Sequence, residues 1–350
     1  MRLGVTLRIR SQLTLGRRPV KSRHTGLNGL EAQVNADGSE RPSGDTVAAG
    51  AQDDWYARFL IEQRLPDTFR RTTELVCKPL AEVAERLRSE RGRTIVIGLC
   101  GAQGSGKSTI ALAVSRILAA RGLRAAVLSL DDLYLTRSER ERLAIDVHPL
   151  LLTRGPPGTH DVDLGVGLLD ALSGGGTIAL PRFDKARDTR CARADWGVID
   201  GPVDVVLFEG WCVGARPEAA AALDLPCNAL EAEQDQDRRW RSYVNDALAG
   251  PYRRLFGRID YQVLLAAPSF EVVHGWRNEQ ERRLRERLQR EGGVGKPMTD
   301  ADIADFIAHY ERLTRHILSQ MPSRADWVAP LGVDRTPFPD GAPPDRPSAF

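Results

Sequence analysis

The chain has 350 residues, of which 42% are hydrophobic, so it is long enough for one large α/β domain or two smaller ones. Its formal net charge of +2 lacks the broad basic excess of general nucleic-acid-binding or membrane-surface proteins, so we predict no nucleic acid and no membrane as partner. No apolar run approaches the roughly 18 residues that a transmembrane helix needs.

The amino-terminal segment differs from the rest of the chain. Residues 1–30 contain seven Lys or Arg and no acidic residue, and residues 1–52 show little apolar periodicity. Such a segment buries too little apolar surface to offset the entropy of ordering, so we predict a disordered basic extension over 1–52. An organelle transit peptide is the alternative. The five cysteines show no CxxC spacing, which is typical of a reduced, cytoplasmic protein.

Apolar residues recur at helical spacing from Trp55 to Leu87 and predict two helices separated near Pro66. They precede the segment Ile95–Thr109, which reads IVIGLCGAQGSGKST. This segment combines a short apolar strand, a glycine-rich loop and the start of a helix, in the order that a phosphate-binding loop requires.

The glycines of this loop let the backbone turn tightly and direct N–H groups inward, toward an anion at the positive end of the following helix. We expect Lys107 to reach the β- and γ-phosphates of ATP and Ser108 to offer its hydroxyl to Mg²⁺. The predicted nucleotide-binding residues are Gly101, Ala102, Gln103, Gly104, Ser105, Gly106, Lys107, Ser108 and Thr109.

Beyond the loop, apolar runs of strand length alternate with helical patterns. Strands are expected at 124–130, 177–180, 204–208, 261–266 and 326–330, and helices at 138–144, 161–172, 270–290 and 302–320. This alternation predicts an α/β fold of the P-loop NTPase type, with a doubly wound, mainly parallel sheet flanked by helices. Residues 53–333 would form this domain, and residues 334–350, with five prolines, a tail.

Two predicted strands end in acidic residues, and ligands of open parallel sheets bind beyond the carboxyl ends of strands. Glu209 directly follows an apolar strand, which is the position of the acid that holds Mg²⁺ in P-loop proteins. Alternatively, Glu209 caps a helix that begins near Arg216. Because side chains alternate along a strand, Asp131 is expected to face the γ-phosphate and act on the acceptor hydroxyl. Asp132 would then be free to cap the helix after Thr136, and capping by both acids is the alternative.

Two loops carry more charge than connectors need. Residues 148–161 hold two His, an Arg and two Thr among three prolines, and residues 181–190 place four cations around two acids. Stiff loops with converging cations suit a small anionic substrate, although the charges of the second loop can also pair with one another in solvent. The expected substrate contacts, with Lys185 and Arg187 leading for a carboxylate, are Asp131, Tyr134, Arg154, Thr159, His160, Lys185 and Arg187.

Arg277 and Arg282 lie on the charged helix predicted at 270–290. A mobile cationic helix that closes over the phosphates would neutralise charge in the transition state. An ordinary solvated helix face is the alternative.

Seven segments, taken together and in order, resemble the D-glycerate 3-kinase family, the plant-type glycerate kinases and their microbial relatives. They are GAQGSGKST, SLDDLYLT, HPLLLTRGPPGTHD, LPRFDKARDTR, FEGWCVGARP, WRNEQE and YERLTR. The resemblance as a whole spans about residues 55–332. The family belongs with phosphoribulokinase, uridine kinase and bacterial pantothenate kinase among the P-loop kinases.

The resemblance implies ATP-dependent, Mg²⁺-assisted transfer of the γ-phosphate to a primary hydroxyl. It also implies Asp131 as the general base, Glu209 as the acid after the Walker-B strand, and Arg277 and Arg282 as lid cations. Leu133, where relatives more often carry Phe, alters the expected shape of the acceptor pocket.

We therefore expect a kinase that uses ATP and Mg²⁺ to phosphorylate a small-molecule substrate, D-glycerate, on its 3-hydroxyl. Uridine, pantothenate or another small alcohol is the alternative acceptor. A nucleotide-switch ATPase is the alternative from another class, but an ATPase needs no acceptor site, so Asp131 and the cation-rich loops favour a kinase. Oligomeric state and the choice between ATP and GTP stay open.

Overall fold

The computed structural model of the chain describes residues 55–291 and 299–339. All of them belong to one of the two compact units of the chain, residues 49–350. The extension predicted for 1–52 lies outside the described residues. No helix within the described ranges is long and apolar enough to cross a bilayer.

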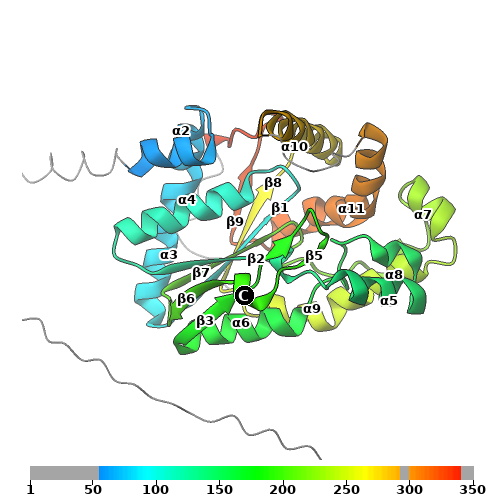
Figure 1. The fold of residues 1–350 in the computed structure, drawn as a ribbon, viewed down its shortest axis with the longest axis horizontal. Helices are drawn as coiled ribbons and strands as arrows, with labels where there is room; N and C mark the ends of the chain where they lie inside the picture. The colour runs from blue at the N-terminus through cyan, green and yellow to red at the C-terminus, as the bar shows by residue number, and fades with distance from the viewer. Residues whose placement is uncertain (1–54, 292–298, 340–350) are drawn as a thin grey trace, which may run out of the picture. The chain divides into compact units, whose positions relative to one another are not determined.

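A five-stranded parallel sheet forms the centre of this unit (Figure 1). In spatial order its strands are β2 (Ala125–Ser129), β7 (Val205–Gly210), β1 (Ile95–Gly101), β8 (Tyr261–Ala266) and β9 (Trp327–Pro330). Every residue of β1 and β7 is buried, as expected for strands that are covered on both faces. The predicted α/β fold with a parallel sheet is confirmed.

Helices cover both faces of the sheet, as Figure 1 shows for α4 on one side and α6 on the other. Ile97 and Leu99 of β1 pack on the first face and Val96 and Cys100 on the second, which is the alternation of a pleated strand. The first face carries α3 (Lys78–Arg91) and α4 (Lys107–Ala120), and the second α6 (Val162–Gly174), α8 (Arg239–Ala249), α9 (Pro251–Phe256) and α11 (Asp300–Gln320).

The remaining helical elements are shorter or lie at the edges. A helix covers residues 55–63, and Pro66 follows it as predicted. The others are α2 (Phe69–Thr72), a π-helical turn (Thr73–Cys77), α5 (Arg137–Asp146), α7 (Ala229–Gln234) and α10 (Phe270–Glu291). Turns of 3₁₀ helix lie at Leu130–Leu133, Pro149–Leu152, Arg193–Asp195, Ala220–Leu223 and Met321–Ser323.

Two parts of the fold differ from the predictions. The strand expected at 177–180 is β3 (Gly176–Leu180), but it pairs antiparallel with β6 (Gly197–Gly201) outside the main sheet. Only Ile178 of β3 is fully buried, so this strand lacks the apolar surface that a central strand needs. A second small sheet joins β4 (Phe183–Asp184) and β5 (Thr189–Arg190).

The segment predicted to be a tail from residue 334 is ordered at its start. Phe338 N donates a hydrogen bond to Pro330 O at 3.0 Å, and Arg335 pairs with Glu279 of α10 at 2.6 Å. Residues 334–339 therefore contact both β9 and α10, whereas residues 340–350 lie outside the described ranges.

Candidate active site

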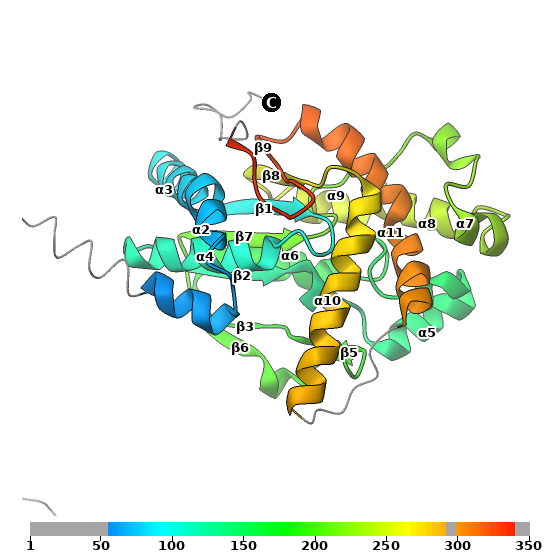
Figure 2. The ribbon, with the colours of Figure 1, turned by 90° about the horizontal axis from the view of Figure 1, so that it is seen from above.

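The phosphate loop connects the carboxyl end of β1, at the centre of the sheet, to the amino terminus of α4. Gly104 and Gly106 have φ angles of 81° and 88°, which glycine adopts without a steric penalty. A Cβ at Gly104 would also lie 2.7 Å from the Cβ of Trp276, so glycine allows α10 to pack directly on the loop. Figure 2 shows α10 running past the carboxyl ends of the strands.

The polar groups of the loop fit a phosphate chain. Ser105 is buried, and its hydroxyl has no hydrogen-bond partner among the described residues. Lys107 begins α4 and forms no ion pair with a described residue. A buried hydroxyl without a partner and a free ammonium group at a helix amino terminus together favour an anionic ligand.

Ser108 and Glu209 fit a magnesium ion. Glu209 is 3% exposed, and its Oε1 accepts a hydrogen bond from Ser108 Oγ at 2.9 Å. Its Oε2 is buried without a partner among the described residues. Such an oxygen is costly to bury unless a cation satisfies it, and Mg²⁺ prefers oxygen ligands. Residues 211–219 contain no helix, so Glu209 does not cap one near Arg216.

The sequence-based geometry of the two aspartates is wrong in one respect. Strand β2 ends at Ser129, and Asp131 and Asp132 lie in the 3₁₀ turn that follows. The alternation of side chains along a strand therefore does not apply to them. The helix α5 is capped by Thr136 in a capping box with Glu139, so neither aspartate is its cap.

Cations from two different segments stabilise the charge of Asp131. Its Oδ2 pairs with Lys185 Nζ at 2.6 Å, and its Oδ1 accepts a hydrogen bond from Tyr134 OH at 2.7 Å. Burial alone would raise the pKa of Asp131, but the charges of Lys185 and Lys107 outweigh burial and hold it well below its usual range. An ionised carboxylate close to the phosphate-loop lysine can accept a hydrogen bond from a substrate hydroxyl.

Asp132 instead holds the second cation-rich loop. Its Oδ1 accepts a hydrogen bond from the backbone N of Phe183 at 3.0 Å. The ring of Phe183 in turn packs edge-on against Tyr134, with 5.1 Å between ring centroids. Asp132 therefore positions β4 and Tyr134.

Two predicted substrate contacts in the loop 148–161 act inside the protein. Thr159 is fully buried, and its hydroxyl donates to Pro156 O at 2.8 Å and accepts from Gly155 N at 3.0 Å. His160 shares a 2.5 Å hydrogen bond with Tyr252, and burial lowers its pKa to about 3. Thr159 thus has no free group for a ligand, and its predicted contact is corrected to a structural role. A neutral His160 cannot form an ion pair with a carboxylate, but its buried Nε2 has no partner among the described residues, so its contact with the substrate stays a prediction.

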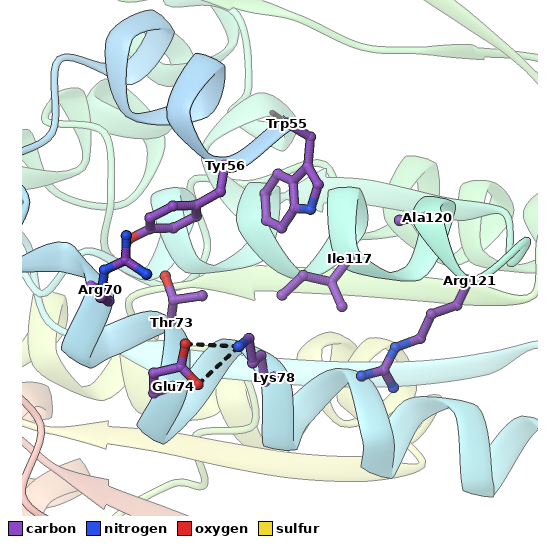
Figure 3. Close-up of a pocket in the computed structure, with 9 residues that line it drawn as sticks. All are labelled: Trp55, Tyr56, Arg70, Thr73, Glu74, Lys78, Ile117, Ala120 and Arg121. Carbon is purple, nitrogen blue, oxygen red and sulfur yellow. Dashed lines mark hydrogen bonds and ion pairs between the residues drawn. The ribbon is translucent and has the colours of Figure 1, made fainter. Parts of the chain in front are cut away.

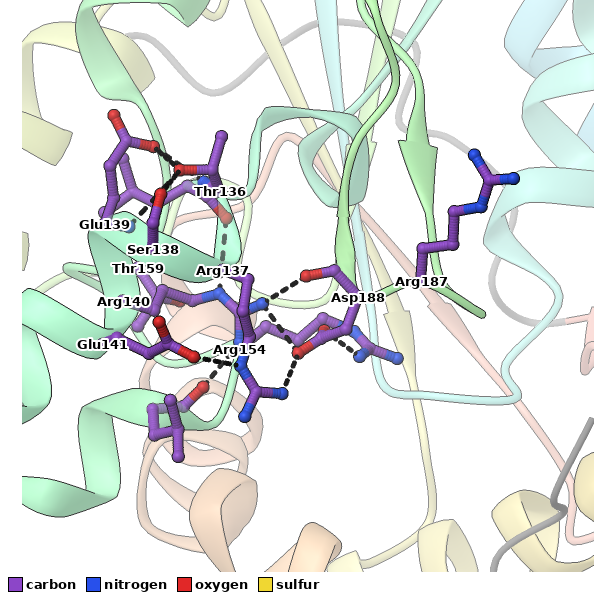
Figure 4. A network of polar contacts seen from close by, with 12 residues as sticks. Thr136, Arg137, Ser138, Glu139, Arg140, Glu141, Arg154, Thr159, Arg187 and Asp188 are labelled. Carbon is purple, nitrogen blue, oxygen red and sulfur yellow. Dashed lines mark hydrogen bonds and ion pairs between the residues drawn. The ribbon is translucent and has the colours of Figure 1, made fainter.

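Three arginines surround Asp188 at the turn between β4 and β5 (Figure 4). Asp188 pairs with Arg140 at 2.8 Å, with Arg137 at 3.2 Å and with Arg154. Arg154 also lies over the ring of Phe183, 5.7 Å from its centroid. Because Phe183 contacts Tyr134, this cluster adjoins the Asp131 site and gives its acceptor side an excess of positive charge.

Arg277 lies close to the same side of the site. It pairs with Glu281 at 3.2 Å and lies over the ring of Phe306 at 5.4 Å. Burial, followed by the charge of Asp131, raises the pKa of Tyr310, while Arg154 and Arg277 oppose this shift. Tyr310 OH donates to Arg154 O at 2.8 Å, so Arg277, Tyr310 and Arg154 form one neighbourhood.

Two other predicted site cations point into solvent. The side chain of Arg187 is 84% exposed, pairs with Asp184 at 3.6 Å, and points away from the Asp188 cluster in Figure 4. The side chain of Arg282 is 64% exposed and pairs with Glu286 at 3.1 Å. Both side chains therefore lie in solvent, as the alternative interpretations of the loop 181–190 and of the charged helix predict.

A cavity of about 480 Å³ adjoins the phosphate loop and has the size of a ligand site. Its walls come from residues 65–72, the loop with Thr109, Gln280 of α10 and residues 333–336. The sequence does not indicate this cavity, because its proline-rich composition predicts a tail from residue 334.

A smaller pocket of about 290 Å³ is lined by Trp55, Tyr56, Arg70 and the far end of α4, including Ala120 (Figure 3). At about 1.5 Å per helical residue, Ala120 lies roughly 20 Å from Lys107, so this pocket is separate from the phosphate loop.

Comparisons with known proteins agree with this geometry. The family model described as "Methylmalonyl Co-A mutase-associated GTPase MeaB" matches residues 60–134. The "Uncharacterized kinase mug58" of Schizosaccharomyces pombe is 31% identical over 252 residues, 68% of this chain and 86% of that protein. The "D-glycerate 3-kinase, chloroplastic" of Arabidopsis thaliana is 29% identical over 262 residues, 72% of this chain and 51% of that protein. This chain therefore spans about half the length of the Arabidopsis protein.

Among solved structures, the D-glycerate 3-kinase from Cryptococcus neoformans var. grubii has a TM-score of 0.60 and 25% identity. The match covers 74% of this chain and 96% of that one. The parallel sheet, the phosphate loop and the strand-end carboxylates define a P-loop phosphotransferase. Together with the relatives, they show that the chain belongs to the D-glycerate 3-kinase family of P-loop kinases.

Proposed function

We propose that this kinase transfers the γ-phosphate of ATP to the 3-hydroxyl of D-glycerate. The observation that carries the proposal is the position of Asp131, which pairs with Lys185 at 2.6 Å and whose pKa is also lowered by the charge of Lys107 in the phosphate loop. A phosphoryl-transfer site needs such a carboxylate between its donor and acceptor sides, to orient the attacking hydroxyl.

The donor side would hold the nucleotide and the metal. Lys107 and the backbone N–H groups of 102–108 would hold the phosphates, and the cavity beside Thr109 has room for the nucleoside. Ser108 and Glu209 would hold Mg²⁺, which when bound neutralises charge on the phosphates.

The acceptor side would bind a small carboxylate. Lys185 is exposed and reaches Asp131, so a substrate hydroxyl that binds Asp131 would release its ammonium group for the substrate carboxylate. Arg154, beside Phe183, supplies a second cation. This assignment favours Lys185 and Arg154 over Arg187, whose side chain points away.

A coupled ADP-release assay with D-glycerate, glycerol, uridine and pantothenate tests the proposal. We expect D-glycerate to stimulate ATP turnover strongly and glycerol to fail, because glycerol would leave the carboxylate-binding cations unpaired. Efficient phosphorylation of glycerol, uridine or pantothenate would disprove the acceptor. ATP turnover that no small alcohol stimulates would instead indicate a nucleotide switch.

A further inference from the structure

A large pocket lies at the edge of the sheet opposite the phosphate loop. It has a volume of about 1100 Å³, and two of its residues, Asp260 and Asp326, immediately precede β8 and β9. The phosphate loop follows the other, carboxyl end of β1. Because β1 has seven residues at about 3.3 Å each, the two sites lie roughly 20 Å apart.

Four arginines and two aspartates line this pocket, and each aspartate interacts with another protein group. Asp260 pairs with Arg91 at 2.5 Å and with Arg93 at 2.6 Å. Asp326 accepts a hydrogen bond from Gln262 N at 2.7 Å. The other three arginines form no ion pair with a described residue; they are Arg216, Arg253 and Arg324.

Arg324 is the most constrained of these three. Its Nη2 donates to Gly214 O at 2.8 Å, but its Nε is buried without a partner among the described residues. Burial and the like charge of Arg216 lower the pKa of Arg324, and burial together with the charge of Arg324 lowers the pKa of His316. Against these three arginines stands one carboxylate that forms no ion pair with a described residue, that of Asp326, so the recess keeps an excess of positive charge.

We propose that this pocket is a second anion site, which binds a small phosphorylated metabolite through Arg216, Arg253 and Arg324. A phosphoryl group offers several oxygen acceptors, and one guanidinium group can donate two parallel hydrogen bonds to two of these oxygens. A volume of about 1100 Å³ exceeds that of one phosphoryl group and leaves space for the organic part of the ligand. The inference is independent of the acceptor proposed above.

Isothermal titration of the full chain with inorganic pyrophosphate tests this site, with saturating MgADP present to fill the phosphate loop. We expect one site, and we expect Arg324→Gln and Arg216→Gln each to weaken binding at least tenfold. Arg258→Gln is the matched control: it removes the same charge, but Arg258 pairs with Asp170 at 2.6 Å outside the pocket. This control should bind as the unchanged protein does.

Two further measurements keep the result interpretable. Thermal denaturation shows whether Arg324→Gln folds; if it does not, Arg216→Gln decides, because Arg216 is exposed and makes no side-chain hydrogen bond with a described residue. The titration is repeated with Lys107→Ala, in which binding should persist. Absence of binding, equal affinity in the pocket variants and the control, or loss of binding with Lys107→Ala would overturn the proposal.

Discussion

Substitution of Asp131 and Asp132, one at a time, by asparagine separates their roles. The Asp131→Asn variant would keep an oxygen for Tyr134 OH but would lose the charge that holds Lys185 at 2.6 Å and the acceptor for the substrate proton. Removal of a general base costs about 10² to 10⁴ in rate, which corresponds to roughly 3 to 5 kcal/mol of transition-state stabilisation. We expect a loss of this size in kcat, with ATP affinity nearly unchanged.

Asp132→Asn is the matched control. Its amide oxygen can still accept the 3.0 Å hydrogen bond from Phe183 N, so the expected cost is below about 1 kcal/mol of folding stability. Burial raises the pKa of Asp132, which makes a neutral amide an acceptable substitute. The assay is ADP release with D-glycerate, together with chemical denaturation of both variants. If Asp132→Asn lowers turnover more than Asp131→Asn at equal stability, the assigned roles are reversed.

Four further predictions concern single side chains. Lys107→Ala should lower turnover by orders of magnitude without unfolding the chain, and activity equal to that of the unchanged protein would refute the phosphate-loop assignment. Glu209→Gln should raise the Mg²⁺ concentration needed for half-maximal rate at least tenfold, measured by Mg²⁺ titration; an unchanged requirement would exclude Glu209 as a ligand. Lys185→Met should raise the KM for D-glycerate far more than Arg187→Met, and equal effects would contradict the observed orientations. His160, with its pKa lowered from 6.5 to about 3, stays neutral when folded but gains a proton when unfolded, so acidification between these values destabilises the fold. Chemical denaturation at several pH values should show that the free energy of unfolding falls less steeply on acidification for His160→Gln than for the unchanged protein, by up to about 1.4 kcal/mol per pH unit. If the two proteins lose stability in parallel, the ring of His160 is not buried in its neutral form.

The central part of the fold could be predicted because its signals are local. The strand, loop and helix at 95–120 are adjacent in sequence, and Gly104 and Gly106 have positive φ angles that suit the tight turn expected of the loop. The helices over 229–256 were not predicted, because α7 and α9 have only six residues each and the interval contains Gly250 and Pro251.

The side chains at the strand ends were predicted less well than the strands. The sequence pattern extended the second strand to residue 130, but β2 ends at Ser129 and a 3₁₀ turn follows. Strand boundaries depend on where the ladder hydrogen bonds end, and β7, the partner of β2, is distant in sequence. The orientation of Asp131 and Asp132 therefore depended on tertiary pairing that no local pattern contains.

Ion pairing on the acceptor side also depends on contacts between residues that are distant in sequence. Within the loop 181–190, cations and acids alternate closely enough to pair locally, and Arg187 does pair with Asp184. Asp188 instead pairs with Arg154 and Arg137, which precede it by 34 and 51 residues. Its φ of 54° turns the chain so that its carboxylate meets them. Spacing along the chain could identify the cations of the site, but only the fold determines which are neutralised and which remain for a substrate.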